Sequence, residues 1–124
     1  PVPPTPTSTP DPDPPIQTWT ALLATWTHFA RSAASLPTQG EPGRFRQAVP
    51  AIIALQALYH ALQNLHQLPH DQARAGQDMA AVLLRSHEAE LTAIWNPDPV
   101  PKGIAELIQD TTAALHRTRE TLPT

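Results

Sequence analysis

The stretch QAVPAIIALQALYHALQNLHQLPH, residues 47–70, contains no Asp, Glu, Lys or Arg, and it decides the fold. Its leucines recur at spacings of three and four residues, which predicts a helix with an apolar face. These leucines are Leu55, Leu58, Leu62 and Leu65. We expect the helix over about residues 44–68, where Pro69 ends it. Pro50 lies inside this span, and it either kinks the helix or marks its true start.

Three further segments show the same periodicity of apolar residues, and prolines and glycines lie in the connections between them. They cover about residues 16–36, 71–95 and 101–122, and Asp13 is expected to cap the first. Short connections between helices of similar length force neighbours to run antiparallel. The sequence therefore predicts an all-α fold, an antiparallel up-down-up-down four-helix bundle over residues 16–122.

Residues 1–15 read PVPPTPTSTPDPDPP and hold eight of the 16 prolines. Proline lacks an amide N–H and disfavours helix in the residue before it, and this segment has no apolar face to bury. It is therefore predicted to be a disordered, proline-rich linker that acts as an extended tether. Its Pro, Thr and Ser composition favours an exported, periplasmic or cell-envelope location.

Composition excludes several classes of function. The chain has no cysteine, so it forms no disulfide and offers no thiolate to a metal or a substrate. Its net charge is −3 and it has one lysine, so it lacks the basic stripe of a nucleic-acid-binding protein. The longest nearly apolar run, residues 49–62, is shorter than the roughly 20 residues of a membrane span. Four glycines and no serine nucleophile motif favour a protein that is not an enzyme.

The second helix is unusual because its polar face carries amides, an imidazole and a phenol instead of charges. Such side chains hydrogen-bond well and cost less to desolvate than ions do. Charge depletion beside an aromatic residue is typical of an interface core. The hypothesis is a protein partner, or a second copy of the chain, on this face; the alternative is an amide-rich habit of a chain that is only 15% charged. The predicted contact residues are Gln56, Tyr59, His60, Gln63, Asn64 and Gln67.

Among the six histidines, only His87 lies on an apolar helix face, between Leu83, Leu84 and Leu91. A buried imidazole needs a hydrogen-bond partner, so His87 is predicted to be either a satisfied core histidine or a ligand. A cofactor-binding bundle, holding haem or a metal through His87 or His116, is the corresponding alternative function. Met79 lies level with His116 and would complete a His/Met haem pair. No core stripe contains an acid, so we expect no bound metal or cofactor.

The stretch His60–Asn64 resembles the active helix of histidine-phosphotransfer domains, which are also four-helix bundles. The resemblance implies that the imidazole of His60 accepts phosphate from receiver aspartates. In that family a lysine follows three residues after the histidine and a glycine four after. Here these positions hold Gln63 and Asn64, which puts the charge balance and the phosphate approach in doubt. The leading hypothesis is thus a non-enzymatic helical bundle for protein–protein interaction or structural display on a flexible tether.

Overall fold

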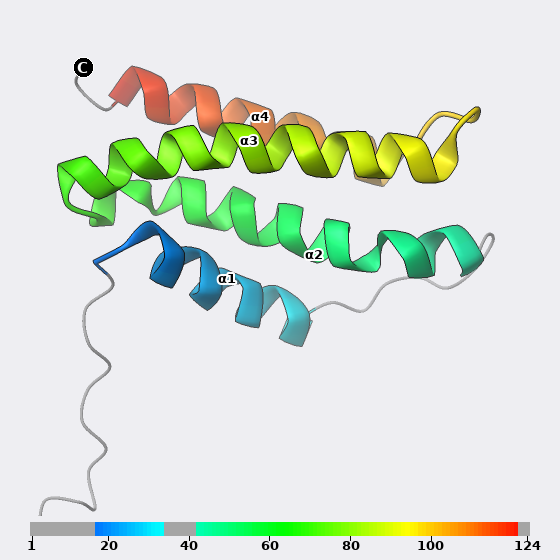
Figure 1. Cartoon of the computed structure of the whole chain (residues 1–124), viewed down its shortest axis with the longest axis horizontal. Coiled ribbons are helices and arrows are strands. Elements are labelled where there is room, and N and C mark those ends of the chain that lie inside the picture. The colour runs from blue at the N-terminus through cyan, green and yellow to red at the C-terminus, as the bar shows by residue number, and fades with distance from the viewer. Residues whose placement is uncertain (1–16, 34–41, 122–124) are drawn as a thin grey trace, which may run out of the picture.

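A computed structural model describes residues 17–33 and 42–121, which form four α-helices and one short 3-10 helix. Their order is α1 (Trp19–Ala33), α2 (Pro42–Gln63), the 3-10 helix η2 (Leu65–Gln67), α3 (His70–Trp95) and α4 (Lys102–Thr121). Consecutive helices run in opposite directions, so the predicted up-down-up-down bundle is confirmed (Figure 1). The predicted linker over residues 1–15 lies outside the described residues.

The first helix begins later than its sequence pattern predicts. Its first helical residue is Trp19, and the Thr18 hydroxyl oxygen accepts a hydrogen bond of 3.1 Å from the Ala21 amide. A threonine that bonds the third amide of a helix is a favoured N-cap, so the helix starts there and not at residue 16. Asp13, the predicted cap, and residues 34–36, the predicted end, lie outside the described residues.

Pro50 lies inside α2 and does not mark its start. The helix begins eight residues earlier, at Pro42. Proline is favoured at the first position of a helix, because a backbone N–H there has no acceptor within the helix. Pro50 is exposed, so the carbonyl that loses its bond can be solvated. The other helix bounds agree with the prediction to within a residue or two, except that α2 gives way to η2 after Gln63.

The helix that contains most of the charge-free stretch, α2, is the centre of the bundle. α2 packs against α1, α3 and α4, whereas α1 contacts α2 extensively and α3 only slightly. A helix with three neighbours must be apolar around most of its circumference. This requirement accounts for the missing charges. The buried residues of α2 are Ala48, Ala51, Ile52, Leu55, Ala57, Leu58, Ala61 and Leu62.

Small residues on α2 widen its buried arc beyond the leucine stripe. On a helical wheel, Ala57 and Ala61 lie far from Leu55 and Leu62, yet both alanines are fully buried. Short side chains let a neighbouring helix approach closely, because interaxial distance depends on the residues at the contact. The leucine stripe therefore serves one side of the packing and the alanines extend the packing to another.

The ends of the bundle are tied by contacts between distant segments. At one end, Phe45 of α2 lies edge-on to the buried Trp95 of α3, with ring centroids 5.3 Å apart. Beside it, Arg44 pairs with Asp98 in the α3–α4 connection at 3.0 Å. At the other end, the Trp19 ring of α1 lies against Gly76 of α3. A Cβ atom at Gly76 would come within 2.8 Å of this ring and 2.9 Å of Leu65.

We predict that Gly76→Ala destabilises the protein although alanine favours helix. The added methyl overlaps the Trp19 ring, so α1 must shift, and overpacking of this kind costs about 1–3 kcal/mol. The helix-propensity gain of about 1 kcal/mol offsets part of this. Urea unfolding followed by tryptophan fluorescence measures the net loss. Gly103→Ala is the matched control, because a Cβ atom there meets nothing within 4 Å and should stabilise α4. Equal gains from both variants would contradict the close packing at Gly76.

Candidate functional site

Five of the six predicted contact residues of the second helix form two separate hydrogen-bonded groups, Tyr59 with Gln63 and His60 with Asn64 and Gln67. Gln63 Nε2 donates to Tyr59 Oη at 2.7 Å, Asn64 Nδ2 donates to the His60 carbonyl at 2.8 Å, and Gln67 Nε2 donates to Asn64 Oδ1 at 2.9 Å. His60, Gln63 and Gln67 are exposed, and the other three, Gln56 included, are half-buried. The polar side chains therefore bond near neighbours along the chain, at the C-terminal end of α2 and in the segment that follows it.

An aromatic cluster adjoins these groups where α1 crosses α2. The imidazole of His60 stacks on the indole of Trp26, with centroids 5.0 Å apart and an interplanar angle of 25°. Trp26 also contacts Phe29 at 5.5 Å, and Phe29 contacts His28 at 6.0 Å. Tyr59 meets His60 edge-on at 5.3 Å. These distances are those of favourable ring pairs. We call His28, Phe29, Trp26, His60 and Tyr59 the ring cluster.

The ring cluster is unusual because it is only partly covered. Phe29 is 55% exposed, and Trp26 and Tyr59 are half-buried. Phe29 lies seven residues after the buried Leu22, on the same side of α1, yet it is exposed. No member carries a permanent charge. The result is a continuous, amphipathic surface that combines exposed ring faces with the amide of Gln63.

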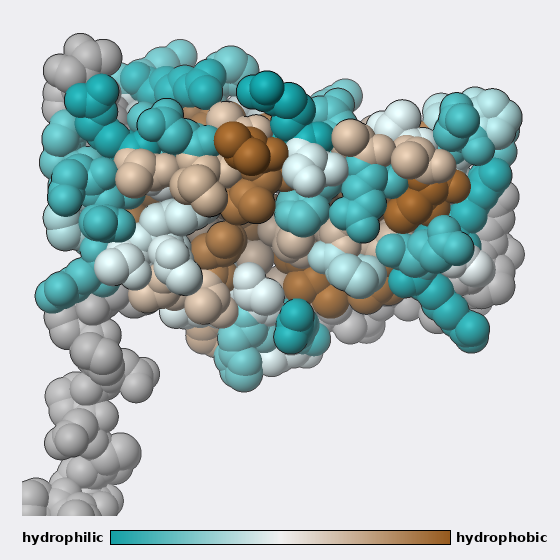
Figure 2. Space-filling view, viewed as in Figure 1, coloured by the Kyte–Doolittle hydropathy of each residue, from teal (hydrophilic) through white to brown (hydrophobic). Residues whose placement is uncertain are grey.

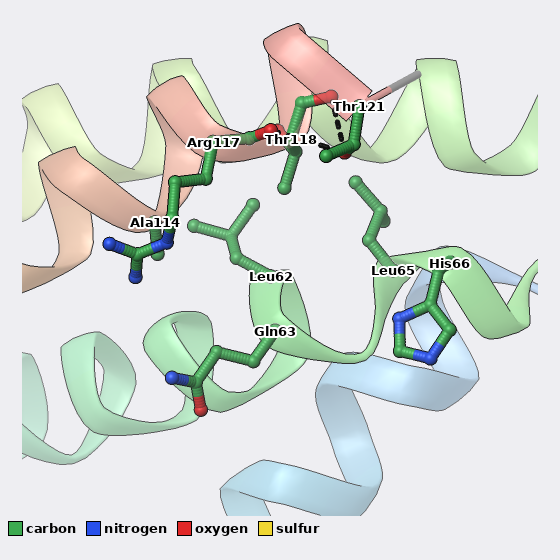
Figure 3. A pocket seen from close by; sticks show the side chains of 8 residues that line it. All are labelled: Leu62, Gln63, Leu65, His66, Ala114, Arg117, Thr118 and Thr121. Carbon is green, nitrogen blue, oxygen red and sulfur yellow. Dashed lines mark hydrogen bonds between the residues drawn. The ribbon is translucent and has the colours of Figure 1, made fainter.

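A surface hollow of about 380 Å³ lies on the other side of Gln63, between the C-terminal ends of α2 and α4 (Figure 3). Its walls combine aliphatic side chains with a polar rim, and they consist of Leu62, Gln63, Leu65, His66, Ala114, Arg117, Thr118 and Thr121. The hydroxyls of Thr118 and Thr121 donate to carbonyls of their own helix. The hollow could receive an aliphatic side chain. It presents no activated nucleophile, because neither hydroxyl is bonded to a base.

His87 faces the core side of α3, as predicted, but it is not a satisfied core histidine. Its side chain is 22% exposed, and the buried Nδ1 atom has no hydrogen-bond partner among the described residues. The nearest acid is Glu90, with Oε2 at 3.6 Å, which is beyond hydrogen-bond distance. His87 lines a cavity of about 70 Å³ with Leu23, Thr27, Ala54, Leu58 and Leu83. That volume is far below what a haem needs.

The remaining candidate ligands do not come together. His116 is exposed on α4, and Met79 is 49% exposed, so the predicted His/Met haem pair does not form in the core. His66 and His70 are exposed near the start of α3. Within residues 17–33 and 42–121, no group of three or more His, Asp and Glu side chains is placed to hold a metal ion.

Comparison with protein-family models, with curated proteins and with solved structures yields no match to this chain. The class is therefore defined by the structure alone: an all-helical, four-helix protein whose helix packing is that of a bundle. Among the helices that the structure describes, none has both the length and the apolar character that crossing a membrane requires.

We predict that His87→Leu leaves the protein as stable as before or stabilises it by about 1 kcal/mol. Leucine removes a buried nitrogen that lacks a partner, and an unsatisfied buried polar group costs about 1–3 kcal/mol. The lost contact with half-exposed Glu90 costs little. Thermal and urea unfolding measure the change, with His116→Leu as an exposed control. A loss of several kcal/mol would mean that His87 makes a structural bond or binds a ligand.

Proposed function

We propose that this chain is a non-enzymatic protein-binding domain that contacts its partner through the ring cluster and the adjoining amides of α2. The observation that carries the proposal is the continuity of five rings from two helices, with Phe29 largely in water. Tryptophan, tyrosine and phenylalanine dominate the energetics of protein interfaces, whose cores are depleted in charge. An isolated exposed phenylalanine is ordinary, whereas a connected aromatic surface is not.

The chemistry of this surface indicates the kind of partner. The rings offer rigid apolar area, and burial of a side chain such as Phe29 contributes roughly 1.5–3 kcal/mol. The amide of Gln63 and the phenol of Tyr59 can exchange their mutual bond for bonds to a partner. Arg31 is exposed one turn beyond His28 on α1. We therefore infer an apolar protein surface with an acidic edge as the partner.

We further propose that the proline-rich residues 1–15 act as a tether for this domain. A tether of this kind raises the local concentration of a binding domain without fixing its orientation. From the same composition we also propose an exported or cell-envelope location for the protein.

The alternatives gain less support from the geometry. A phosphate acceptor at His60 would need a cation beside it, yet its imidazole lies between Trp26 and Tyr59, and no Lys or Arg occurs within one turn of it along α2. A cofactor held by His87 would have to fit a cavity of about 70 Å³. His116 and His87 do not line a common cavity among those described.

We predict that Phe29→Glu weakens partner binding at least about tenfold, because a carboxylate replaces the exposed phenylalanine ring and faces an acidic edge. The free energy of unfolding should change by less than about 1 kcal/mol at this exposed position. The partner is first trapped by a photo-crosslinking residue at position 29 or 63 in the native host. The purified partner is then titrated calorimetrically against both proteins.

The control is position 113 on α4, where Ala113 is exposed and lies outside the ring cluster. A crosslinker there should not trap the same protein, and Ala113→Glu should bind normally. Equal trapping from position 113, or unchanged affinity of Phe29→Glu, would contradict the proposed surface. An acid-labile phosphate that His60→Ala abolishes would instead support phosphotransfer.

A further inference from the structure

The outer face of α3 carries apolar residues where a surface helix usually carries charges. Met79 is 49% exposed and Val82 is 60% exposed, and they are neighbours three residues apart on one side of the helix. On a helical wheel, both point away from the buried residues Ala73, Ala80 and Leu91. Figure 2 shows brown and tan side chains gathered over the middle of the face that α3 crosses, with hydrophilic side chains around them.

The residues that continue this face are uncharged as well. They alternate at spacings of four and three, all are exposed, and they comprise Ala75, Met79, Val82, Ser86, Ala89 and Ala93. Apolar residues that recur every 3.5 positions on average form the seam of a coiled coil. An amphipathic surface helix would place its charges along this line, directly opposite its core face. On α3 the charges lie on the flanks.

We propose that a second copy of this chain covers the face, through antiparallel pairing of α3 with α3 about a twofold axis between Met79 and Val82. In that arrangement Met79 of each copy packs against Val82 of the other, and Ala75 packs against Ser86. The pairing is isologous, so each contact occurs twice, as in most homodimers. The core face of α3 is on the opposite side, so the two bundles lie apart.

The flanking charges select the second copy as the occupant. Asp78 and Arg85 occupy equivalent flanking positions, one heptad apart, on the same side of the apolar line. Neither forms an ion pair with another described residue. Around the proposed axis, Asp78 of one copy meets Arg85 of the other, and the symmetry repeats the pair. The face is therefore complementary in charge to itself.

The same charges exclude the neighbouring antiparallel registers. An axis between Val82 and Ser86 brings the two Arg85 side chains together, and an axis between Ala75 and Met79 brings the two Asp78 side chains together. Like charges across such a seam are repulsive. The axis between Met79 and Val82 is the register that joins opposite charges twice and also puts the two largest apolar side chains at the centre.

One helix face per copy is a small interface. It buries less than the roughly 800 Å² per partner of a stable complex, so the dimer must be weak and its population must rise with concentration. The pairing uses α3, whereas the ring cluster lies on α1 and α2. A dimer could therefore present two ring clusters to one partner, and either proposal can fail while the other holds.

Sedimentation equilibrium of the full chain over a wide range of concentrations tests the pairing. We expect reversible dimerisation, which Asp78→Arg or Arg85→Asp weakens about tenfold, because each variant turns two attractive pairs into two repulsive ones. A mixture of the two variants should dimerise again, to within about threefold of the unchanged protein, as a heterodimer with two Arg–Asp pairs. Circular dichroism checks that each variant is folded.

Val82→Glu should abolish the dimer, because it buries a carboxylate beside the twofold axis, and Ala113→Glu on α4 should leave it unchanged. A chain that stays monomeric at the highest concentration overturns the proposal. An Asp78→Arg variant that dimerises normally, or a mixture of single variants that fails to recover, overturns it equally, since parallel pairing or another surface would then be at work.

Discussion

The structure depends on one constraint: α2 must pack against three helices at once. A helix with three neighbours has little surface to give to water, and a charge on it would be desolvated without compensation. This explains why α2 carries no Asp, Glu, Lys or Arg after Arg46, while α3 and α4 carry their charges on exposed flanks. The alanines of α2 follow from the same constraint, because Ala57 and Ala61 are buried on a side where leucines would hold a neighbouring helix too far away.

The strip of α2 that remains open forms part of the surface that we propose for partner binding. α1 and α4 lie on different sides of α2 (Figure 1). On the side of α1, His60 stacks on Trp26. Gln63 bonds Tyr59 and also lines the hollow beside α4 (Figure 3). The amides, the rings and the hollow are thus one continuous surface at the junction of three helices. Loss of charge from α2 suits packing on most of its circumference and, on the rest, the partner binding that we propose.

Much of the fold could be predicted from sequence, because apolar periodicity and prolines are local signals. The sequence could not decide whether Pro50 lies within the second helix or marks its start, because that depends on whether the proline ring and the carbonyl that loses its hydrogen bond face solvent. The start of α1 was predicted too early, because Thr18 competes with Asp13 as a cap and only the bonded geometry decides. Helical spacing indicates the polar side of the second helix, but it cannot show that His60 stacks on Trp26 or that Phe29 is exposed, because these depend on how α1 packs against α2. The apolar residues at heptad spacing on α3 are visible in the sequence, but only their exposure in the structure shows that no described helix covers this face.

The most direct test of this account is native-state hydrogen exchange of backbone amides in α2, followed by NMR at increasing denaturant. If α2 is the centre of the bundle, the amides of Leu55, Leu58 and Leu62 exchange only when the whole domain unfolds, with opening free energies at least as high as those in α3 and α4. Local opening of these amides at a lower free energy than the amides of Leu115 and its neighbours in α4 would contradict the central position of α2.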